Sequence, residues 1–262
     1  MALVDIHNHI GWDIDDGMPD KESAELTLKN AQADGITTII ATPHVIPGVH
    51  TKQRDIKTLN ERLDEVATLA KNYNIKIIKG CEIFLNYEFM NLIDYNLFNT
   101  LGDSNYILVE FDVRRDISTF NDADDYLYEL TIRNYRVIIA HVERYFHRKI
   151  DLKRIQSWIN MGCYIQVNRT SLLGLHGSGN QSNANKLLEN GLVHLIASDT
   201  HQSSGHRICK LSDVYDYIKH DYDEAYADLL LNENPNRIIK NEELKLLQFK
   251  RKTFVNRFFW KR

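Results

Sequence analysis

Short hydrophobic segments alternate along the chain with longer segments in which apolar residues recur every three or four positions. The short segments are rich in β-branched residues, which is typical of buried strands. They cover Leu3–Ile6, Ile36–Ala41, Ile75–Lys79, Tyr106–Val109, Val137–Ala140, Tyr164–Val167 and Val193–Ala197. The longer segments predict amphipathic helices over Lys21–Ala33, Ile56–Asn72, Ala123–Arg133, Leu152–Met161 and Ala184–Asn190. Regular alternation of strand and helix predicts parallel βα units.

Histidine or acidic residues follow six of these seven predicted strands, and only Tyr164–Val167 leads into none of them. A closed barrel of βα units places its active site at the carboxyl ends of its strands. The series therefore predicts a ring of polar residues around a barrel mouth. The motifs are Asp5-Ile6-His7-Asn8-His9, Asp15-Asp16-Gly17, Ala41-Thr42-Pro43-His44, Gly80-Cys81-Glu82, Val109-Glu110-Phe111, Ala140-His141 and Ser198-Asp199-Thr200-His201.

Two of these motifs have the spacing of metal ligands. His7 and His9 are two residues apart, as are Asp199 and His201, and such residues face the same way in an extended strand. Imidazole and carboxylate groups are ligands for Zn, Mn or Fe. Single residues carry a weaker signal, because an isolated acidic residue also serves as a strand-end cap or a turn. The isolated histidines are interpreted as surface or core residues, namely His50, His147, His176, His194, His206 and His220.

Taken together, the motifs resemble the PHP (polymerase and histidinol phosphatase) superfamily. They are most similar to the bacterial tyrosine-protein phosphatases of capsular and exopolysaccharide operons. The matching pieces are colinear between about residues 3 and 240 and read DIHNHI, DIDDG, TIIATPH, GCEI, YILVEF, VIIAHVERY, MGCYIQVN and HLIASDTH. The resemblance implies an α/β fold, a distorted (β/α)7 barrel of the PHP type, that holds three divalent metal ions. It favours Mn²⁺ and leaves Fe and Zn open.

The same resemblance implies a ligand set. One metal takes His7, His9, Glu82 and Asp199; a second shares Glu82 and adds Glu110 and His141; the third takes Asp16, His44 and His201. Many small-molecule phosphatases of the superfamily carry histidine at the positions of Asp16 and Glu110. The carboxylates in this chain therefore favour the tyrosine-phosphatase branch.

The expected function is hydrolysis of phosphotyrosine on a cognate bacterial tyrosine kinase that regulates capsular or exopolysaccharide synthesis. Metals lower the pKa of a coordinated water to about 7, so hydroxide can attack phosphorus without a phosphoenzyme. Two alternatives remain open. One is a phosphatase for a small metabolite such as histidinol phosphate. The other is a non-catalytic scaffold that binds the kinase, which the complete ligand set disfavours.

Two arginines are candidates for binding phosphate. Arg144 lies three residues after His141, where its guanidinium could hold a phosphate through two parallel hydrogen bonds. The alternative for Arg144 is a surface ion pair with Glu143. Arg207, six residues after His201, is the second candidate, although its register in the loop is left open.

A second phosphatase motif is present by spacing alone. Cys163 and Arg169 match the C-x5-R signature of cysteine-based tyrosine phosphatases. That signature needs a compact loop of small residues that points amide groups at the phosphate. The intervening residues contain no glycine and predict a strand, so we do not expect thiol catalysis. The cysteines number three and have no CxxC spacing, which suits a reducing compartment.

Composition agrees with a cytoplasmic enzyme of one domain over residues 1–244. The net charge is −4 and only four of the 262 residues are proline, which argues against nucleic-acid binding and long linkers. No signal peptide and no apolar run of about 18 residues is visible. Residues 245–262 form a tail that combines seven Lys or Arg with aromatic residues. This tail is interpreted either as a solvated end or as an anchor on an acidic partner or the inner face of the membrane.

Overall fold

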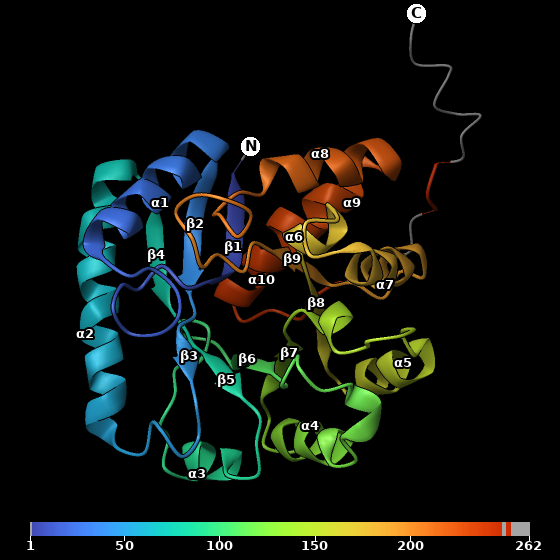
Figure 1. The fold of residues 1–262 in the computed structure, drawn as a ribbon, viewed down its shortest axis with the longest axis horizontal. Coiled ribbons are helices and arrows are strands. Elements are labelled where there is room, and N and C mark those ends of the chain that lie inside the picture. The colour runs from blue at the N-terminus through green and yellow to red at the C-terminus, as the bar shows by residue number, and fades with distance from the viewer. Residues whose placement is uncertain (1, 248–249, 253–262) are drawn as a thin grey trace, which may run out of the picture.

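The chain folds as an α/β protein with parallel sheets (Figure 1). The computed structural model describes residues 2–247 and 250–252. One sheet has the order β1 (Leu3–Asn8), β2 (Ile36–Ala41), β4 (Lys76–Lys79). The other has the order β3 (His44–Val45), β5 (Glu82–Phe84), β6 (Tyr106–Glu110), β7 (Arg136–Ile139), β8 (Tyr164–Asn168), β9 (Leu195–Ala197).

Short irregular segments connect the two sheets. Only Thr42 and Pro43 separate β2 from β3, and proline cannot donate a hydrogen bond to the ladder. Gly80 and Cys81 separate β4 from β5 in the same way. A Cβ atom on Gly80 would come within 2.8 Å of Leu101, so the chain can pass here only as glycine unless Leu101 shifts. Two backbone bonds cross the break, from Gly80 N to the carbonyl of Ala41 (2.9 Å) and from Glu82 N to that of Pro43 (3.0 Å).

Backbone pairing also links the first strand to the segment after the last. Asn8 and Thr200 form a parallel bridge. His9 N donates to the Thr200 carbonyl (3.0 Å), and Asp199 N donates to the His7 carbonyl (3.0 Å). Chain segments separated by about 190 residues therefore meet at one edge, and both carry predicted ligands.

Strands such as β6, β7 and β8 are buried on both faces, which explains their nearly continuous apolar sequence. Strand β4 differs, because its residues are exposed or half-buried. One face packs against the helices through residues such as Ile39, Ile107 and Ile139. The other face forms a separate cluster that includes Ile40, Leu108 and Ile138. Neighbours in the sequence thus point into different clusters, as the period of two in a strand requires.

Helices surround the strands in Figure 1. The longest described helix is α2 (Gln53–Ala70), and it buries Ile56, Leu59, Leu63 and Val66 at the three- and four-residue spacing of an amphipathic helix. The remaining α-helices are α1 (Lys21–Asp34), α3 (Phe89–Asp94), α4 (Ala123–Thr131), α5 (Leu152–Asn160), α6 (Arg169–Leu172), α7 (Ser178–Glu189), α8 (Ser212–Asp221), α9 (Glu224–Asp228) and α10 (Asn234–Ile239).

The predicted strands are present with small shifts of their ends, whereas the helices show larger differences. The helix predicted over Ala184–Asn190 begins at Ser178, six residues earlier. Its first turns read SGNQSN and show no apolar periodicity. The structure adds the short strands β3 and β5 and the helices α3, α6, α8, α9 and α10, which were not predicted from the sequence.

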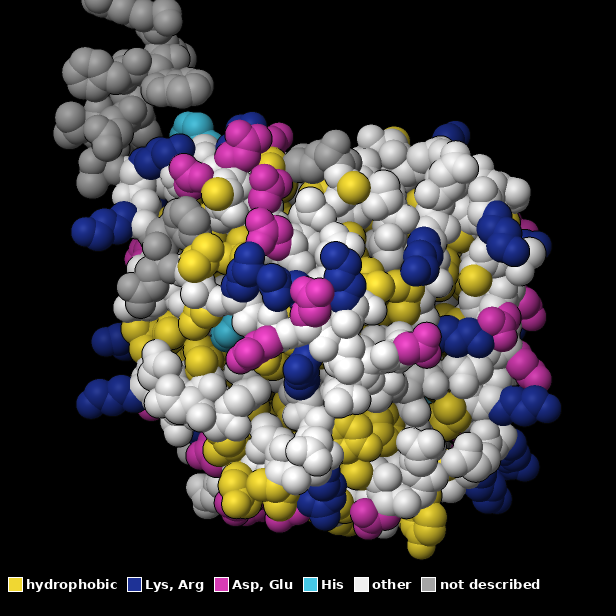
Figure 2. Space-filling model, turned by 180° about the vertical axis from the view of Figure 1, so that it is seen from behind, with side chains coloured by type: hydrophobic (Ala, Val, Ile, Leu, Met, Phe, Trp, Pro, Cys, Tyr) yellow, Lys and Arg dark blue, Asp and Glu magenta, His cyan; other side chains and the backbone are white. Residues whose placement is uncertain are grey.

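Basic and acidic side chains are interspersed on the face that Figure 2 shows. Within the described residues, no helix is long and apolar enough to cross a membrane. Residues 248–249 and 253–262 of the predicted tail lie outside the described residues. Of its described part, Lys245 forms an ion pair with Glu233 (3.3 Å), and Arg251 binds Asp221 (2.7 Å) and Glu189 (3.0 Å).

Candidate metal centre

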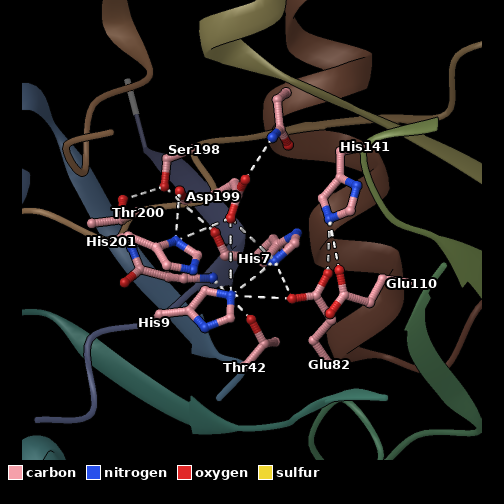
Figure 3. Close-up of polar contacts among 12 residues, drawn as sticks. His7, His9, Thr42, Glu82, Glu110, His141, Ser198, Asp199, Thr200 and His201 are labelled. Atoms are coloured by element: carbon pink, nitrogen blue, oxygen red, sulfur yellow. Dashed lines mark hydrogen bonds and ion pairs between the residues drawn. The ribbon is translucent and has the colours of Figure 1, made fainter. Parts of the chain in front are cut away.

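Nine predicted residues meet in one cluster, and seven of them are labelled in Figure 3. Each one lies within ion-pair distance of at least one other member of the set. The set comprises His7 on β1, His9 and Asp16 after β1, His44 on β3, Glu82 on β5, Glu110 on β6, His141 after β7, and Asp199 and His201 after β9.

Glu82 lies at the centre of this cluster. Its Oε2 atom is 3.1 Å from His7 Nε2, 3.2 Å from His9 Nε2 and 3.2 Å from His44 Nδ1. Its Oε1 atom is 3.0 Å from His141 Nε2, as Figure 3 shows. The carboxylate is 1% exposed, and burying such a charge is costly unless cations or strong donors surround it.

The outer edge of the cluster carries Asp16. Its Oδ1 atom is 3.3 Å from His44 Nε2 and 3.2 Å from His201 Nε2, and its side chain is 67% exposed. His44 joins this group to the interior, because its Nδ1 atom is 3.0 Å from Glu110 Oε1. The His201 ring lies 3.9 Å from the His9 ring, measured between centroids.

Electrostatics keep the buried carboxylates ionised. Burial raises the pKa of Glu82, but the charges of His7 and His44 outweigh it and hold that pKa well below its usual value. The pKa of Asp199 is also well below its usual value, because His7 and His201 outweigh its burial. Two ionised carboxylates in one buried site favour a cation between them.

The pKa values of two histidines shift upward, opposite to those of the carboxylates. Burial lowers the pKa of His44, but the Glu82 carboxylate and the hydrogen bond with Asp16 raise it to about 12. Burial likewise lowers the pKa of His201, and its bond with Asp16 raises it to about 9. These imidazoles therefore hold protons at neutral pH, and a bound metal would replace those protons.

Unusual backbone geometry occurs at two of the nine residues. His141 has φ of 32° and Asp199 has φ of 50°, both in the left-handed region that non-glycine residues seldom adopt. Such strain persists where surrounding structure fixes it, and it is common at functional sites. Both residues directly follow the end of a strand or lie close to it, where the turn aims the side chain into the cluster.

Asp15 is a functional candidate that the sequence analysis did not separate from its turn. Its Oδ2 atom accepts from His9 Nδ1 (2.7 Å) and from the His44 backbone amide (3.1 Å). It therefore fixes the ring of His9 with Nε2 facing the cluster. Gly17 is needed in the same turn, because a Cβ atom there would come within 2.2 Å of the His9 carbonyl oxygen.

The strand without a predicted ligand, β8, supplies two further partners. Gln166 Oε1 lies 3.2 Å from His7 Nδ1 and accepts from the His141 amide at 2.9 Å. Asn168 Nδ2 donates to Asp199 Oδ2 at 2.7 Å. Gln166 and Asn168 are both buried and lie two residues apart, so they face the same way. In the sequence, the only signal for Gln166 and Asn168 was that they alternate with apolar residues along the predicted strand. Side-chain amides are not usual metal ligands.

Both candidate phosphate-binding arginines reach the cluster at Asp199. Arg144 Nη1 lies 3.4 Å from Asp199 Oδ2, and Arg207 Nη2 lies 2.9 Å from Asp199 Oδ1. The alternative ion pair of Arg144 with Glu143 does not form among the described residues. Glu143 is instead fully buried and accepts from the Asn168 amide (3.2 Å). Arg207 thus occupies the same mouth as Arg144.

The isolated histidines are not members of the nine-residue cluster. His50 accepts from the Ile46 amide at 2.9 Å, and His194 accepts from the Ile165 amide at 3.1 Å. Burial lowers the pKa of His194 to about 3. Burial, and next the charge of Arg144, lower the pKa of His176 to about 4, so it is neutral at physiological pH.

Thiol chemistry has no place at Cys163. This residue precedes β8, whereas Arg169 follows its other end, so the two lie at opposite ends of one strand. Arg169 binds Asp213 at 2.6 Å. Burial raises the pKa of the Cys163 thiol to about 12, which removes the nucleophilic thiolate at neutral pH. The expectation that this motif is a decoy agrees with the geometry.

The fold and the cluster together define an α/β protein with buried side-chain groups that could hold metal ions. A family model described as "Capsular polysaccharide synthesis, CpsB/CapC" matches residues 3–240. The chain belongs to this family, which confirms the resemblance that the sequence motifs indicated.

Individual relatives agree with this assignment. The tyrosine-protein phosphatase CpsB of Streptococcus pneumoniae is 29% identical over 247 residues, which cover 92% of this chain and 99% of CpsB. The putative tyrosine-protein phosphatase CapC of Staphylococcus aureus is 32% identical over 201 residues, covering 76% of this chain and 77% of CapC. The tyrosine-protein phosphatase YwqE of Bacillus subtilis is 27% identical over 249 residues, which cover 92% of this chain and 93% of YwqE.

Solved structures agree as well. One chain is described with YwqE and CpsB as "unique metal-dependent tyrosine phosphatases" and superposes with a TM-score of 0.78 at 25% identity. The match covers 96% of this chain and all of the solved chain. A chain of archaeal ribonuclease P matches with a TM-score of 0.59 at 15% identity, which shows a shared fold and no shared activity.

Proposed function

We propose that this protein is a metal-dependent protein-tyrosine phosphatase. The observation that carries the proposal is the convergence of nine histidine and carboxylate side chains on one largely buried site in a chain of the CpsB/CapC family. Relatives that align over nearly their whole length are named tyrosine-protein phosphatases. Phosphate monoesters hydrolyse very slowly without a catalyst, so the site must stabilise the transition state strongly.

The proposed ligands fall into three groups, as the resemblance implied. Supporting distances connect His7, His9, Glu82 and Asp199; Glu82, Glu110 and His141; and Asp16, His44 and His201. Three sets of potential ligand atoms lie within 4.8 Å of one another, and they divide the residues differently: His9, Asp16, His44 and His201; His7, His9 and Glu82; and His44, Glu82 and Glu110. The donors are nitrogen and oxygen without thiolate, which suits Mn, Fe or Zn, and we propose Mn²⁺ in the working enzyme.

The contact between two histidines supports a cation here. His7 Nε2 and His9 Nε2 lie 3.1 Å apart, and both face Glu82 Oε2. Either a hydrogen bond between the two imidazoles or a cation bound by both nitrogens accounts for this separation. The Oε2 atom of Glu82 and Nδ1 of His44 are buried within ion-pair distance of one another (3.2 Å), but neither makes a hydrogen bond of good geometry among the described residues. A metal ion would satisfy both atoms.

Bound divalent ions would lower the pKa of a coordinated water to about 7 and neutralise charge on the phosphoryl oxygens. The chain's own residues hold the reacting groups in place. Asp15 and Gln166 fix the rings of His9 and His7 through their outer nitrogens. We propose that Arg144 and Arg207 bind the phosphate, because each presents a guanidinium beside Asp199 at the mouth.

The two sheets are proposed to form one distorted (β/α)7 barrel. In this description β2 continues into β3 and β4 continues into β5, which reduces the strands to seven. The bridge between Asn8 and Thr200 supports closure, as do the two separate apolar clusters on the strand faces. The barrel and its helices would form one domain over residues 1–244.

The proposed substrate is a phosphotyrosine-bearing bacterial tyrosine kinase of capsular or exopolysaccharide synthesis, met in the cytoplasm. The family description, which concerns capsular polysaccharide synthesis, supports this proposal. The tail could add contact with an anionic membrane face. Its described residues Lys245 and Arg251 already pair with acidic residues of the protein, which leaves fewer of its charges for such a contact.

Turnover of two substrates tests the proposal. Metal-loaded protein should release phosphate from a phosphotyrosyl peptide much faster than from histidinol phosphate. A preference for histidinol phosphate would instead place the protein with the small-metabolite phosphatases. Absence of turnover for both, with metal bound, would favour the scaffold alternative.

A further inference from the structure

A cavity of about 390 Å³ lies at the carboxyl ends of β5 and β6, the two strands that carry Glu82 and Glu110 of the candidate metal centre. Its inner wall includes Phe84, which follows Glu82 by two residues and pairs with Glu110 across the parallel ladder. Residues two apart on a strand face the same way. Phe84 therefore lies on the same face of β5 as Glu82, and its pairing with Glu110 puts this wall of the cavity next to one member of the cluster.

Aromatic side chains form much of this cavity. Phe111 and Phe120 pack edge to face with ring centroids 5.7 Å apart, and Phe120 and Tyr126 do so at 5.4 Å. Tyr87 lies at the cavity and is 82% exposed, so its ring is accessible to a guest. Walls of this kind prefer an aromatic guest, because edge-to-face contacts add to the free energy of burial.

Charges around the cavity are balanced. Arg114 binds Asp112 through Nε, at 2.8 Å from Oδ1, so neither group offers a net charge to a guest. Arg115 and Asp122 also line the cavity and carry opposite charges. These four side chains together carry no net charge, which agrees with an uncharged guest.

We propose that this aromatic cleft binds an aromatic side chain of the substrate polypeptide, next to the phosphotyrosine that occupies the metal centre. The inference rests on the proposed phosphatase function and specifies its substrate as a polypeptide with an aromatic neighbour. A small metabolite would reach the metal centre and leave the cleft empty. The contact would be made equally in the ground state and the transition state, so it acts mainly on KM.

A set of phosphotyrosyl peptides tests the cleft. A single phenylalanine is moved through the positions on either side of the phosphotyrosine, with alanine elsewhere. At one position it should raise kcat/KM about 10-fold over the all-alanine peptide, which corresponds to burying one aromatic ring against others. The gain should appear in KM, with kcat nearly constant.

Two substitutions test whether the phenylalanine advantage arises in the cleft. Tyr87→Ala should reduce the phenylalanine advantage to less than about 3-fold, since it removes one wall of the cleft. Because Tyr87 is 82% exposed, this change leaves the core intact. The matched control is Tyr95→Ala, an exposed tyrosine (69%) outside the cleft lining, which should keep the full advantage.

The inference is overturned if phenylalanine gives no advantage at any position, or if Tyr87→Ala retains the full advantage. A small aryl phosphate is too short to reach the cleft. Its hydrolysis therefore distinguishes failure of the cleft proposal from failure of the proposed phosphatase function. If metal-loaded wild-type protein hydrolyses neither the peptides nor the aryl phosphate, the proposed phosphatase function and the cleft both fail.

Discussion

Asn168 donates a hydrogen bond from Nδ2 to Oδ2 of Asp199 at 2.7 Å, and both residues are buried. This bond joins β8, the strand without a predicted ligand, to the Asp199 carboxylate. The same carboxylate contacts Arg144 and Arg207. Loss of such an orienting partner in metal sites costs about 10- to 100-fold in metal affinity or activity. We therefore expect Asn168→Ala to lower kcat/KM on a phosphotyrosyl peptide by about that factor.

Titration of the metal into each variant measures the change in affinity directly. Asn160→Ala, at an exposed asparagine on α5, is the control and should behave as wild type. Unchanged metal affinity and activity in Asn168→Ala would show that Asp199 is held without this bond.

Removal of proposed ligands should be far more damaging than removal of the decoy thiol. His7→Ala or Asp199→Ala takes a group from the centre of the cluster, so most of kcat should be lost together with bound metal. Cys163→Ser should leave activity nearly unchanged, because burial holds its thiol protonated. Steady-state kinetics with circular dichroism as a folding control makes the comparison. An inactive but folded Cys163→Ser protein would revive the thiol mechanism.

Phosphate recognition is tested at Arg144. Arg144→Lys keeps the charge but loses the planar pair of donors, so kcat/KM should fall clearly, by about 10-fold. Inorganic phosphate should inhibit wild-type protein competitively and the variant more weakly. If Arg144→Ala alters neither kcat/KM nor phosphate inhibition, phosphate binding belongs to Arg207, whose Nη2 atom is 2.9 Å from Asp199.

Metal uptake should release protons. In the metal-free protein the pKa values of His141 and His201 are raised to about 9, so both are protonated at pH 7 and must lose a proton to bind metal. Affinity should therefore rise with pH from 6 to about 9. Calorimetric titration of metal in two buffers with different ionisation enthalpies measures the released protons. Identical heats in both buffers would contradict protonation of these histidines.

The sequence predicted seven of the strands well because most of them are apolar on both faces and therefore have a strong local signal. The strands β3 and β5, two and three residues long, are too short for such a signal and were missed. The nine clustered residues could be found for a related reason, since each follows or ends such a strand. Short helices such as α9, five residues long, have no room for a periodic pattern and were missed. Gln166 and Asn168 were missed because their roles depend on contacts with His7 and Asp199, which only the fold brings near.

The central claim is that turnover of phosphotyrosine depends on metal held by the cluster. The most direct test removes metal with a chelator, verifies its absence by elemental analysis, and then adds Mn²⁺ back while phosphate release from a phosphotyrosyl peptide is followed. Activity should disappear with the metal and return with Mn²⁺. Full activity in the verified metal-free protein would contradict the account.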